Sequence, residues 1–406
     1  MRVLLLTQLF DPENVIKGLS FAKGLVSRGH EVEVVTTFPS YPGGRIYPGY
    51  KMRWRQVENI DGVRVVRVFS YISHGRSAFK RLMSYASFSS FALLYSLFGA
   101  KRPDVIYSYY PPVVGGSAAA ILGFVQRRPM IYDVQDLWPE ALVATGMVQS
   151  PRLIGVIEAM VTWIYRRAAA VVVLSDGYKS SIERKGIPAK KVFRIYNWCD
   201  ESRLVRKTPA ARSAGEWFNI TYAGNLGSAQ ALDHVLEAAA LVQERADNKV
   251  RFVFVGEGVE KTQLQNNART LGLKNVLFVP QVAPEKVGAL LDASGALLTH
   301  LAADPVFSIT VPSKTQAYLA AGRPILMGVD GESADIIGRA GAGVVVSPCD
   351  PADIARGALE LANKSSVELA ALGEAARRFY ENQMSQNNGI DRIVEVLNLV
   401  VADSKY

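Results

Sequence analysis

Residues 307–324, FSITVPSKTQAYLAAGRP, have the pattern of a loop that opens a short helix. Pro312 and Ser313 are typical of a helix start, Pro as a first-turn residue or Ser as a cap. Good helix formers follow, and Gly322 and then Pro324 are typical of a helix end. The stretch therefore predicts a loop, a short helix and a sharp stop.

Apolar runs on both sides place this helix in a larger pattern. Residues 296–298 before it and 324–327 after it have the apolar character of buried strands. Strand, loop, helix and strand in this order are typical of a nucleotide-binding α/β domain. Free amides at the helix start, with Lys314 beside them, would suit an anion such as a diphosphate. An ordinary capped helix explains the same residues without a ligand, so both interpretations stand at this point.

The length of the chain, 406 residues, predicts roughly two to three domains. Two cysteines, Cys199 and Cys349, are too few for a disulfide framework or a metal cluster, which is typical of a reducing compartment. The apolar run within residues 1–7 is too short for the core of a signal peptide. It is therefore predicted to be the first buried strand.

The net charge of +9 is unevenly distributed. Residues 1–198 hold 26 Lys and Arg against 13 Asp and Glu, whereas the remainder holds 20 against 24. A basic half joined to a mildly acidic half indicates two lobes with different partners. The basic lobe could face nucleic acid, an anionic membrane or a phosphorylated substrate. Its basic residues are dispersed and follow no recognised nucleic-acid motif, which argues against nucleic acid.

Two series of alternating strands and helices follow one another along the chain. The first begins with a strand at 3–7, a helix at 17–28 and a strand at 31–36, which predicts a parallel sheet with right-handed crossovers. After a polar linker at 198–217, the second series begins with a strand at 219–223. The sequence contains no Gly-x-Gly-x-x-Gly or Walker motif, so tight binding of NAD or of an ATP γ-phosphate is not expected.

Residues 82–98 contain no charged side chain and lie between basic pairs at 80–81 and 101–102. A transmembrane span is one interpretation, although the segment is short for it. A buried helix of the α/β core is the second. The third is a core helix whose outer face also touches a bilayer, and the similar aromatic and basic residues at 161–167 favour it.

Carboxylates follow the strand predicted at 130–132. Asp133, Asp136 and Glu140 stand at its carboxyl end, where open parallel sheets bind their ligands. They are therefore candidates for chemistry or for substrate contact. Capping of the next helix by Asp133 or Asp136 is equally compatible with the sequence.

Seven short motifs occur in order between residues 28 and 314, each weak alone and together specific. They are RGHEV at 28–32, FPSYPGG at 38–44, DLWPE at 136–140, NW at 197–198, GNLG at 224–227, GEG at 256–258 and PSK at 312–314. With these motifs the whole chain resembles the retaining glycosyltransferases of family 4. Within that family it is similar to the bacterial branch that includes the N-acetyl-L-fucosamine transferases of surface-polysaccharide assembly.

The resemblance implies an α/β protein of the GT-B type, with two Rossmann-like, doubly wound domains facing across a cleft. Residues 1–198 would bind the acceptor, with a C-terminal helix at 388–406 packing back on them, and residues 199–387 would bind the nucleotide sugar. The implied reaction moves an N-acetylated deoxy-aminosugar, such as N-acetylfucosamine, from a UDP-sugar to a polyprenyl-diphosphate-linked acceptor in O-antigen, capsule or exopolysaccharide assembly. Neither a metal, a cofactor nor a strong protein nucleophile is expected. The protein would lie peripherally on the cytoplasmic face of the bacterial inner membrane, with its basic N-terminal domain on the anionic surface.

The functional positions of the family are carried over residue by residue. Asp136, Lys314 and Glu13 are the implied catalytic residues. The acceptor side would hold Glu13, Gln135, Asp136 and Glu140. A lone histidine at a strand end is as often a structural hydrogen-bonding residue, so this alternative stays open for His300. The implied donor contacts are Lys17, Gly18, Asn225, Gly227, Glu257, Gly258, His300, Asp304, Ser308, Pro312, Ser313 and Lys314.

Several positions depart from the family pattern. Ile309 and Ala317 stand where the broad family has two glutamates, the second of which holds the ribose hydroxyls. Asn225 and Gln230 replace a common Arg and Lys, and Gln135 replaces a histidine found in many relatives. The donor phosphates would then rely on the two lysines among the implied donor contacts and on backbone amides.

Two other functions fit the same fold. A sugar-nucleotide epimerase would be soluble and would not need a basic, apolar acceptor lobe, so partition between membrane and cytosol separates the two. A non-catalytic protein that binds a sugar nucleotide or organises a polysaccharide complex is permitted by the missing glutamates. The presence of Asp136, Lys314 and the Pro312-Ser313 pair argues against this last function.

Overall fold

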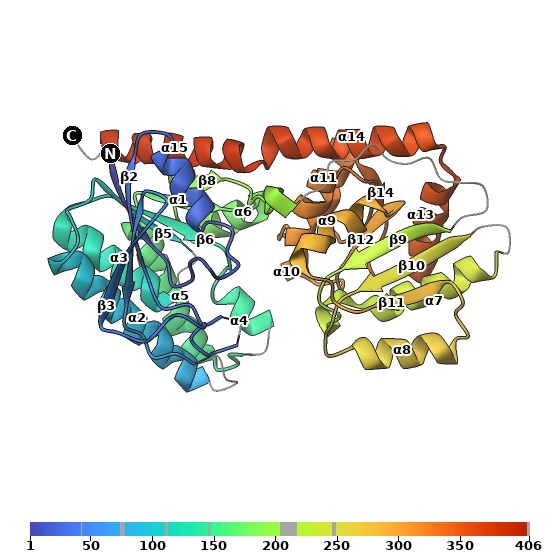
Figure 1. Ribbon diagram of the computed structural model, residues 1–406, viewed down its shortest axis with the longest axis horizontal. Coiled ribbons are helices and arrows are strands. Elements are labelled where there is room, and N and C mark those ends of the chain that lie inside the picture. Colours follow the sequence, from blue (N-terminus) through green and yellow to red (C-terminus); the bar gives the residue numbers. More distant parts are fainter. Residues whose placement is uncertain are drawn as a thin grey trace. The chain divides into compact units, whose positions relative to one another are not determined.

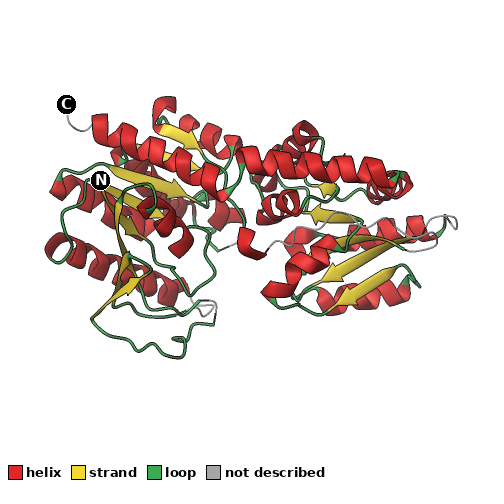
Figure 2. Cartoon of the chain, turned by 45° about the horizontal axis from the view of Figure 1, so that its top comes forward, coloured by secondary structure: helices red, strands yellow, loops and turns green. Residues whose placement is uncertain are grey.

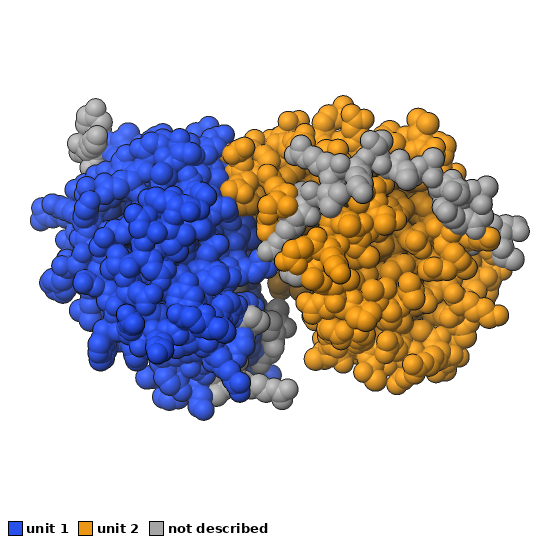
Figure 3. Space-filling model, viewed as in Figure 1, with its two compact units in different colours: residues 1–196, 389–406 blue, residues 197–388 orange. Residues whose placement is uncertain are grey.

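The computed structural model describes residues 1–41, 43–73, 78–109, 113–144, 147–203, 217–245 and 249–403. The chain divides into two compact units, unit 1 with residues 1–196 and 389–406 and unit 2 with residues 197–388 (Figure 3). Pro42 of the FPSYPGG motif, residues 204–216 of the predicted linker and residues 404–406 of the predicted last helix lie outside the described residues.

Unit 1 is built on a mostly parallel sheet. Its described strands are β1 (Arg2–Leu6), β2 (Glu31–Thr36), β3 (Arg55–Ile60), β4 (Val63–Val68), β5 (Val105–Tyr109), β6 (Met130–Val134), β7 (Ala170–Val173) and β8 (Val192–Arg194). They are ordered β3-β4-β2-β1-β5-β6-β7-β8, and only β3 and β4 pair antiparallel among them. β5 and β7 are buried along their whole length, as expected for apolar strands covered on both faces.

Helices cover this sheet (Figures 1 and 2). The described ones are α1 (Leu19–Val26), α2 (Ala78–Phe98), α3 (Val113–Gln126), α4 (Glu140–Ala144), α5 (Pro151–Arg167), α6 (Asp176–Arg184), the 3-10 turn η1 (Ala189–Lys191) and α15 (Gln386–Asp403). α2 packs on α3 and α3 packs on α5. The last helix returns to the first, because Arg28 donates to Asp391 at 2.6 Å and a Cβ on Gly24 would lie only 2.4 Å from the Ile390 side chain.

Unit 2 is built on a second parallel sheet. Its described strands are β9 (Phe218–Ala223), β10 (Val250–Val255), β11 (Val276–Val279), β12 (Ala296–His300), β13 (Ile325–Gly328) and β14 (Gly343–Val345), in the order β11-β10-β9-β12-β13-β14. Its described helices are η2 (Glu201–Arg203), η3 (Ser228–Gln230), α7 (Leu232–Gln243), α8 (Lys261–Thr270), α9 (Pro284–Asp292), α10 (Pro305–Ser308), α11 (Ser313–Ala321), α12 (Glu332–Ala340), α13 (Pro351–Asn363) and α14 (Ser366–Gln383).

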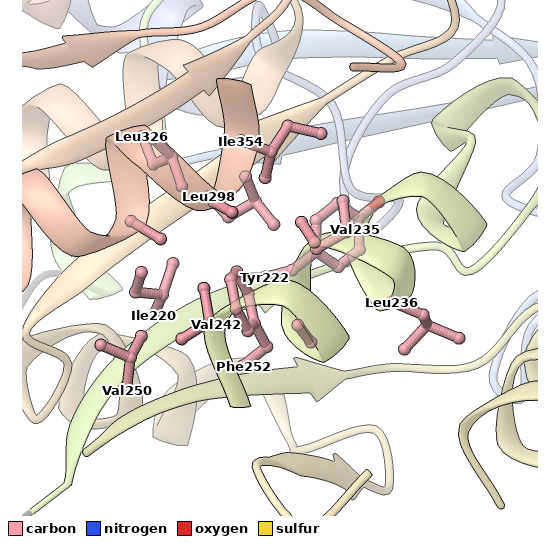
Figure 4. Packing of buried hydrophobic residues seen from close by; sticks show 14 of the residues in the cluster. Ile220, Tyr222, Val235, Leu236, Val242, Val250, Phe252, Leu298, Leu326 and Ile354 are labelled. Carbon is pink, nitrogen blue, oxygen red and sulfur yellow. The ribbon is translucent and has the colours of Figure 1, made fainter. Parts of the chain in front are cut away.

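The core of unit 2 lies where its sheet meets α7 and α13. Tyr222, Phe252 and Leu298 of the strands pack in one buried cluster with Val235 of α7 and Ile354 of α13 (Figure 4). All five side chains are fully or almost fully buried. This packing holds the carboxyl ends of the central strands at fixed positions, since close-packed cores resist displacement.

Both sheets are doubly wound. β1 has β2 on one side and β5 on the other, and β9 has β10 on one side and β12 on the other. Ligands of such sheets bind at the carboxyl ends of the strands beside this reversal. The predicted α/β architecture with two Rossmann-like halves is confirmed.

The uncharged segment at 82–98 forms most of α2. Phe88, Ala92 and Tyr95 on one side are buried, whereas Phe79 and Phe98 are exposed. α2 is therefore only half buried, unlike a fully buried core helix. Over the part of the chain that the structure describes, no helix is both long and apolar enough to cross a membrane.

Candidate active site

A pocket of about 680 Å³ lies at the carboxyl ends of β9 and β10 in unit 2. Asn225, Glu257 and Gly258, three of the predicted donor contacts, line it. A cavity with a largely apolar wall and a few polar groups is typical of a small-molecule site. The other lining residues are Cys199, Asp200, Ala223, Gly224, Val255, Gly256, Gln281, Val282, Val287, Gly288, Leu291 and Ala317.

The loops after β9 and β10 pack backbone against backbone at this pocket. The N–H of Leu226 donates to the Glu257 carbonyl at 2.8 Å, and the N–H of Gly224 donates to the Val255 carbonyl at 2.9 Å. Gly224 has a φ of +150°, which side-chain-bearing residues rarely adopt. A Cβ there would also lie 2.6 Å from Cε of Lys314. The glycine therefore allows a lysine of α11 to approach the pocket.

Lys314 stands in the first turn of α11, which begins after Pro312 with Ser313. Its amino group lies 4.7 Å from the centre of the Tyr222 ring. Among the described side chains, none forms an ion pair with Lys314 and none caps α11. Burial lowers the pKa of Lys314 to about 8, because the ammonium group loses hydration. A cation without a counter-ion beside free helix-start amides attracts anions such as a diphosphate.

His300 at the end of β12 is buried, and both of its ring nitrogens have partners. Nδ1 donates to the Gln230 carbonyl at 2.7 Å, and Nε2 accepts from the N–H of Cys349 at 3.2 Å. Burial lowers the pKa of His300, so the ring is held in one neutral tautomer. The geometry thus gives His300 a structural role, and its predicted contact with the donor sugar stays a prediction.

Other polar residues near the predicted donor loop also serve the local backbone. Asp304 caps α10 by accepting from the N–H of Val306 at 2.8 Å, and Ser308 donates its hydroxyl to the Pro305 carbonyl at 2.8 Å. Gln230 accepts from the N–H of Gly227 at 3.1 Å. These contacts fix the loops and leave the donor contacts predicted for Asp304, Ser308 and Gly227 untested.

Lys17 in unit 1 is fully buried and forms an ion pair with Asp133 at the end of β6. Asp133 also accepts from the hydroxyl of Tyr107 and, at 2.6 Å, from the amide of Gln135. Asp133 thus already neutralises the charge of Lys17, and a buried pair of this kind is costly to separate. The charge of Lys17 is thus used inside unit 1, and its predicted contact with the donor phosphates stays a prediction.

The first N–H group of α1 is hydrogen-bonded to the carboxylate of Asp11. Asp11 accepts from the N–H of Leu19 at 2.6 Å, and a Cβ on Gly18 would lie 2.1 Å from the same carboxylate oxygen. The family resemblance implies that amides at Gly18 approach the donor diphosphate. In this chain the Asp11 carboxylate occupies that helix start as an internal cap.

Glu13 holds two loops of unit 1 together. Its buried carboxylate accepts from the backbone N–H groups of Phe10 at 3.1 Å, Ser40 at 2.7 Å and Tyr41 at 2.7 Å. These three backbone donors satisfy a carboxylate that would otherwise be costly to bury. Glu13 therefore orders the loop after β2 against the loop after β1, and its predicted catalytic role is untested.

Asp136 is exposed just beyond the carboxyl end of β6. Burial, and then the nearby Asp136 carboxylate, raise the pKa of Tyr178 on α6. Burial also raises the pKa of Tyr85 on α2, with a smaller contribution from Asp136, so the carboxylate lies near both phenols. Glu140 in the first turn of α4 forms a 2.8 Å ion pair with Lys185. Asp136 is thus exposed at this edge, and Glu140 is held by Lys185.

Comparison with known proteins places both units in one class. Residues 19–198 match the family described as Glycosyl transferase 4-like domain, and residues 209–383 match the family described as Glycosyl transferases group 1. Sucrose-phosphate synthase from Thermosynechococcus elongatus has the same fold, with a TM-score of 0.71 over 99% of each chain at 15% identity. The chain is a glycosyltransferase of the GT-B fold.

Two further proteins resemble this glycosyltransferase. WcaI of Escherichia coli (strain K12), whose name assigns it as a glycosyl transferase to colanic acid biosynthesis, is 28% identical over 318 residues, which are 73% of this chain and 75% of WcaI. Alr3699/HepE of Anabaena, solved in complex with UDP-glucose, is 16% identical with a TM-score of 0.66, covering 98% of this chain and 100% of that one. At this level of identity, the structural likeness shows only that the two proteins share a fold.

Sequence reasoning missed several residues of this glycosyltransferase. Cys199 and Asp200 line the pocket from the segment predicted as a featureless linker. Asp11 caps α1, and Tyr222 lies beneath the amino group of Lys314. Asp11 gave no sequence signal of a cap, because it stands eight residues before the first residue of α1, outside the position of an ordinary helix cap. Tyr222 gave no signal of its own, since a tyrosine in a buried strand is ordinary.

Among the described residues of this glycosyltransferase, no group of three or more His, Cys, Asp and Glu side chains is placed to hold a metal ion. The predicted independence from metals and cofactors stays a prediction. What the described part of unit 2 offers a ligand is a cation, helix-start amides and an apolar pocket wall.

Proposed function

We propose that this protein transfers a sugar from a nucleotide-sugar donor bound in unit 2 to an acceptor bound in unit 1, with retention at the anomeric carbon. The single observation that carries the proposal is Lys314. Its ammonium group is buried beside Gly224, a residue of the pocket wall, and no described side chain forms an ion pair with it, which costs stability unless a ligand supplies the negative charge. A donor diphosphate would supply that charge.

The pocket supports a nucleotide diphosphate as the leaving group. Apolar residues such as Val282, Val287 and Leu291 suit one face of a base. The amides at the start of α11 and the ammonium group of Lys314 suit the phosphates. The structure of Alr3699/HepE with UDP-glucose supports a UDP-sugar as the donor. The family resemblance supports an N-acetylated deoxy-aminosugar, such as N-acetylfucosamine, as the transferred group.

The chain's own residues then have distinct tasks in the reaction. The acceptor hydroxyl forms a bond with the anomeric carbon while the bond from that carbon to the phosphate oxygen breaks. Lys314 and the α11 amides hold the negative charge that develops on the departing diphosphate. The departing phosphate takes the proton of the acceptor hydroxyl on the same face, so that the configuration is retained. Asp136, exposed after β6, orients the acceptor by accepting a hydrogen bond from a neighbouring hydroxyl of the acceptor sugar, which leaves the proton of the attacking hydroxyl to the phosphate.

The acceptor in this proposal is a saccharide linked to polyprenyl diphosphate. The naming of WcaI for colanic acid biosynthesis supports a role in the assembly of a surface polysaccharide, such as an O-antigen, capsule or exopolysaccharide. A lipid-linked acceptor would require the protein to work peripherally at the cytoplasmic face of the bacterial inner membrane. The excess of basic residues in the first 198 residues fits an anionic membrane surface.

A thermal-shift panel with UDP, GDP, ADP and dTDP tests the donor site first, because a ligand that binds only the folded state raises its melting temperature. The expected result is a shift with UDP. Incubation of the protein with UDP-sugars and a polyprenyl-diphosphate saccharide, followed by mass spectrometry of the lipid product, tests transfer. An acceptor heavier by one sugar supports the proposal. A donor isomerised without transfer identifies an epimerase, and an unchanged donor and acceptor after nucleotide binding identify a non-catalytic protein.

A further inference from the structure

The outer side of α5 carries an apolar stripe that packing inside unit 1 does not use. Leu153, Val156, Met160 and Trp163 recur at spacings that place them on one side of a helix, and all four are exposed. Val161 and Tyr165, which α5 buries against unit 1, lie on its other side. A surface helix ordinarily has polar residues on its outer side. α5 is therefore apolar on two sides.

The helices beside α5 show the same feature. Phe98 at the end of α2 is 84% exposed, and Phe124 near the end of α3 is 68% exposed. Together these exposed apolar residues form what we call the helix face: Phe79, Leu82, Met83, Leu94 and Phe98 of α2, Ile121, Phe124 and Val125 of α3, and Leu153, Val156, Met160 and Trp163 of α5. Apolar patches of this kind mark sites of interaction with a partner or a membrane.

Contacts between the helix ends show that these residues belong to one surface. Gln126 at the end of α3 donates to the carbonyl of Ser96 in α2 at 2.9 Å. The Arg102 side chain after α2 donates to the carbonyl of Gln126 at 3.0 Å. The guanidinium of Arg167 at the end of α5 lies 5.1 Å from the centre of the Phe124 ring of α3. The last turn of α3 therefore directly neighbours the ends of both α2 and α5.

The charges around the helix face have almost one sign. A basic pair follows α2 at 101–102 and α3 at 127–128, and α5 ends in one at 166–167. Over residues 78–102, 113–128 and 151–167, the chain holds nine basic residues and one acid, Glu158, which pairs with Lys185. Two copies of the same face would bring like charges together, which disfavours self-association. Exposed aromatic and aliphatic groups bordered by basic residues fit a membrane interface.

We propose that the helix face lies flat on an anionic lipid bilayer. The apolar side chains enter the boundary between headgroups and acyl chains, and the basic pairs contact lipid phosphates. A surface hollow of about 550 Å³ at the end of α3, lined by Phe124, Val125, Arg127 and Arg128 with Gly123 and Pro129, offers a place for an anionic headgroup. The occupant is thus an anionic phospholipid surface.

This orientation matters for the proposed transfer reaction, on whose lipid-linked acceptor it rests. Gln8, just after β1, donates its side-chain amide to the hydroxyl of Ser84 on α2 at 3.3 Å, so the first half of α2 lies at the carboxyl edge of the sheet, where Asp136 also stands. The candidate acceptor edge of unit 1 is therefore next to the first half of the helix face. A protein lying on this face holds Asp136 beside the membrane surface, where the diphosphate and first sugars of a polyprenyl-linked acceptor stand. Binding through the helix face would thus place the acceptor site at the same distance from the bilayer as the reacting sugar of the acceptor.

Co-sedimentation with lipid vesicles tests the inference on the full-length protein without substrates. We expect binding to vesicles of phosphatidylcholine with phosphatidylglycerol, weak binding to phosphatidylcholine alone, and a loss of binding as salt rises. The double variant Phe98→Ser, Phe124→Ser should bind roughly tenfold or more weakly, because two aromatic rings no longer enter the lipid. Arg127→Gln, Arg128→Gln should lower binding roughly tenfold at low salt.

Val259→Ser, Val367→Ser is the matched control, since both valines are exposed in unit 2, at 87% and 76%. This control should bind vesicles like the wild type. Absence of binding to anionic vesicles, or an equal loss in the control, overturns the inference. A dimer seen by light scattering and lost in the Phe98 and Phe124 variant would instead assign the face to a protein contact.

A thermal shift with UDP, measured without lipid, separates the membrane inference from the proposed function. A UDP shift without vesicle binding overturns only the membrane inference. Vesicle binding without a UDP shift overturns only the donor assignment.

Discussion

Replacement of Lys314 by methionine should stabilise the ligand-free protein and at the same time weaken donor binding. Methionine has a similar length and adapts to irregular spaces, but it carries no charge. In the wild-type protein the buried ammonium group has no counter-ion among the described side chains, and the donor diphosphate is proposed to supply one. One substitution therefore separates two effects of Lys314, the loss of stability in the ligand-free protein and the gain in donor affinity.

The magnitude follows from the pKa of Lys314, which burial lowers from 10.5 to about 8. At about 1.4 kcal/mol per pKa unit, the charged form costs up to about 3.5 kcal/mol of folding free energy, and partial contact with water reduces this. Because the pKa in the folded state lies below that of the unfolded chain, the cost is present in full below pH 8 and disappears as the pH approaches 10.5. Loss of a charge-assisted contact of about 1.5–3 kcal/mol should weaken donor binding roughly 10- to 150-fold.

Thermal unfolding with and without UDP measures both effects. Near neutral pH the Lys314→Met protein should melt a few degrees above the wild type, since about 1 kcal/mol corresponds to roughly 2–4 °C in a domain of this size. UDP should raise its melting temperature less than that of the wild type. Lys364→Met, at a lysine that faces Glu360 on α13, is the control and should change neither quantity. A Lys314→Met protein that melts below the wild type, or that keeps the full UDP shift, would refute the reasoning.

Three further predictions concern the same sites. UDP affinity measured by titration calorimetry should fall as the pH rises through about 8, because free Lys314 loses its proton there, and Lys314→Met should show no such fall. Asp136→Asn should lower turnover roughly 10²- to 10⁴-fold with unchanged UDP affinity, and wild-type turnover would remove Asp136 from the mechanism. Asp11→Ala should destabilise the protein by about 0.5–2 kcal/mol in thermal or urea unfolding, through loss of the α1 cap, without weakening UDP binding. Tighter UDP binding by the Asp11 variant would show that this carboxylate competes with the donor.

The parts of the site that sequence analysis located are those encoded locally. The strand–loop–helix pattern around Lys314 is contiguous, and its predicted helix is α11. Asn225, Glu257 and Gly258 follow directly after strands, and parallel sheets gather such loops at one edge. Period, caps and turn residues are enough to predict arrangements of this kind.

Other features depend on partners far away in the chain. Lys17 meets Asp133, 116 residues further on, and neither residue signals that the other will neutralise it. His300 is fixed by the backbone of Gln230 and Cys349, which no side-chain pattern reveals. The sequence predicts the helix face only in part. The reason is that α5 is apolar on two sides, and its sequence does not say which side packs against unit 1. Such facts emerge only when the sheet order is known.

The return of α15 to α1 has a consequence for the order in which the protein acquires its structure during synthesis. Arg28 and Gly24 belong to the earliest part of the chain, and their partners Asp391 and Ile390 leave the ribosome only after all of unit 2. Nascent domains generally fold from the N-terminus onward. The surface of α1 that α15 covers therefore stays exposed while unit 2 is translated and folds. A nascent chain arrested near residue 388 should expose that surface to chaperones.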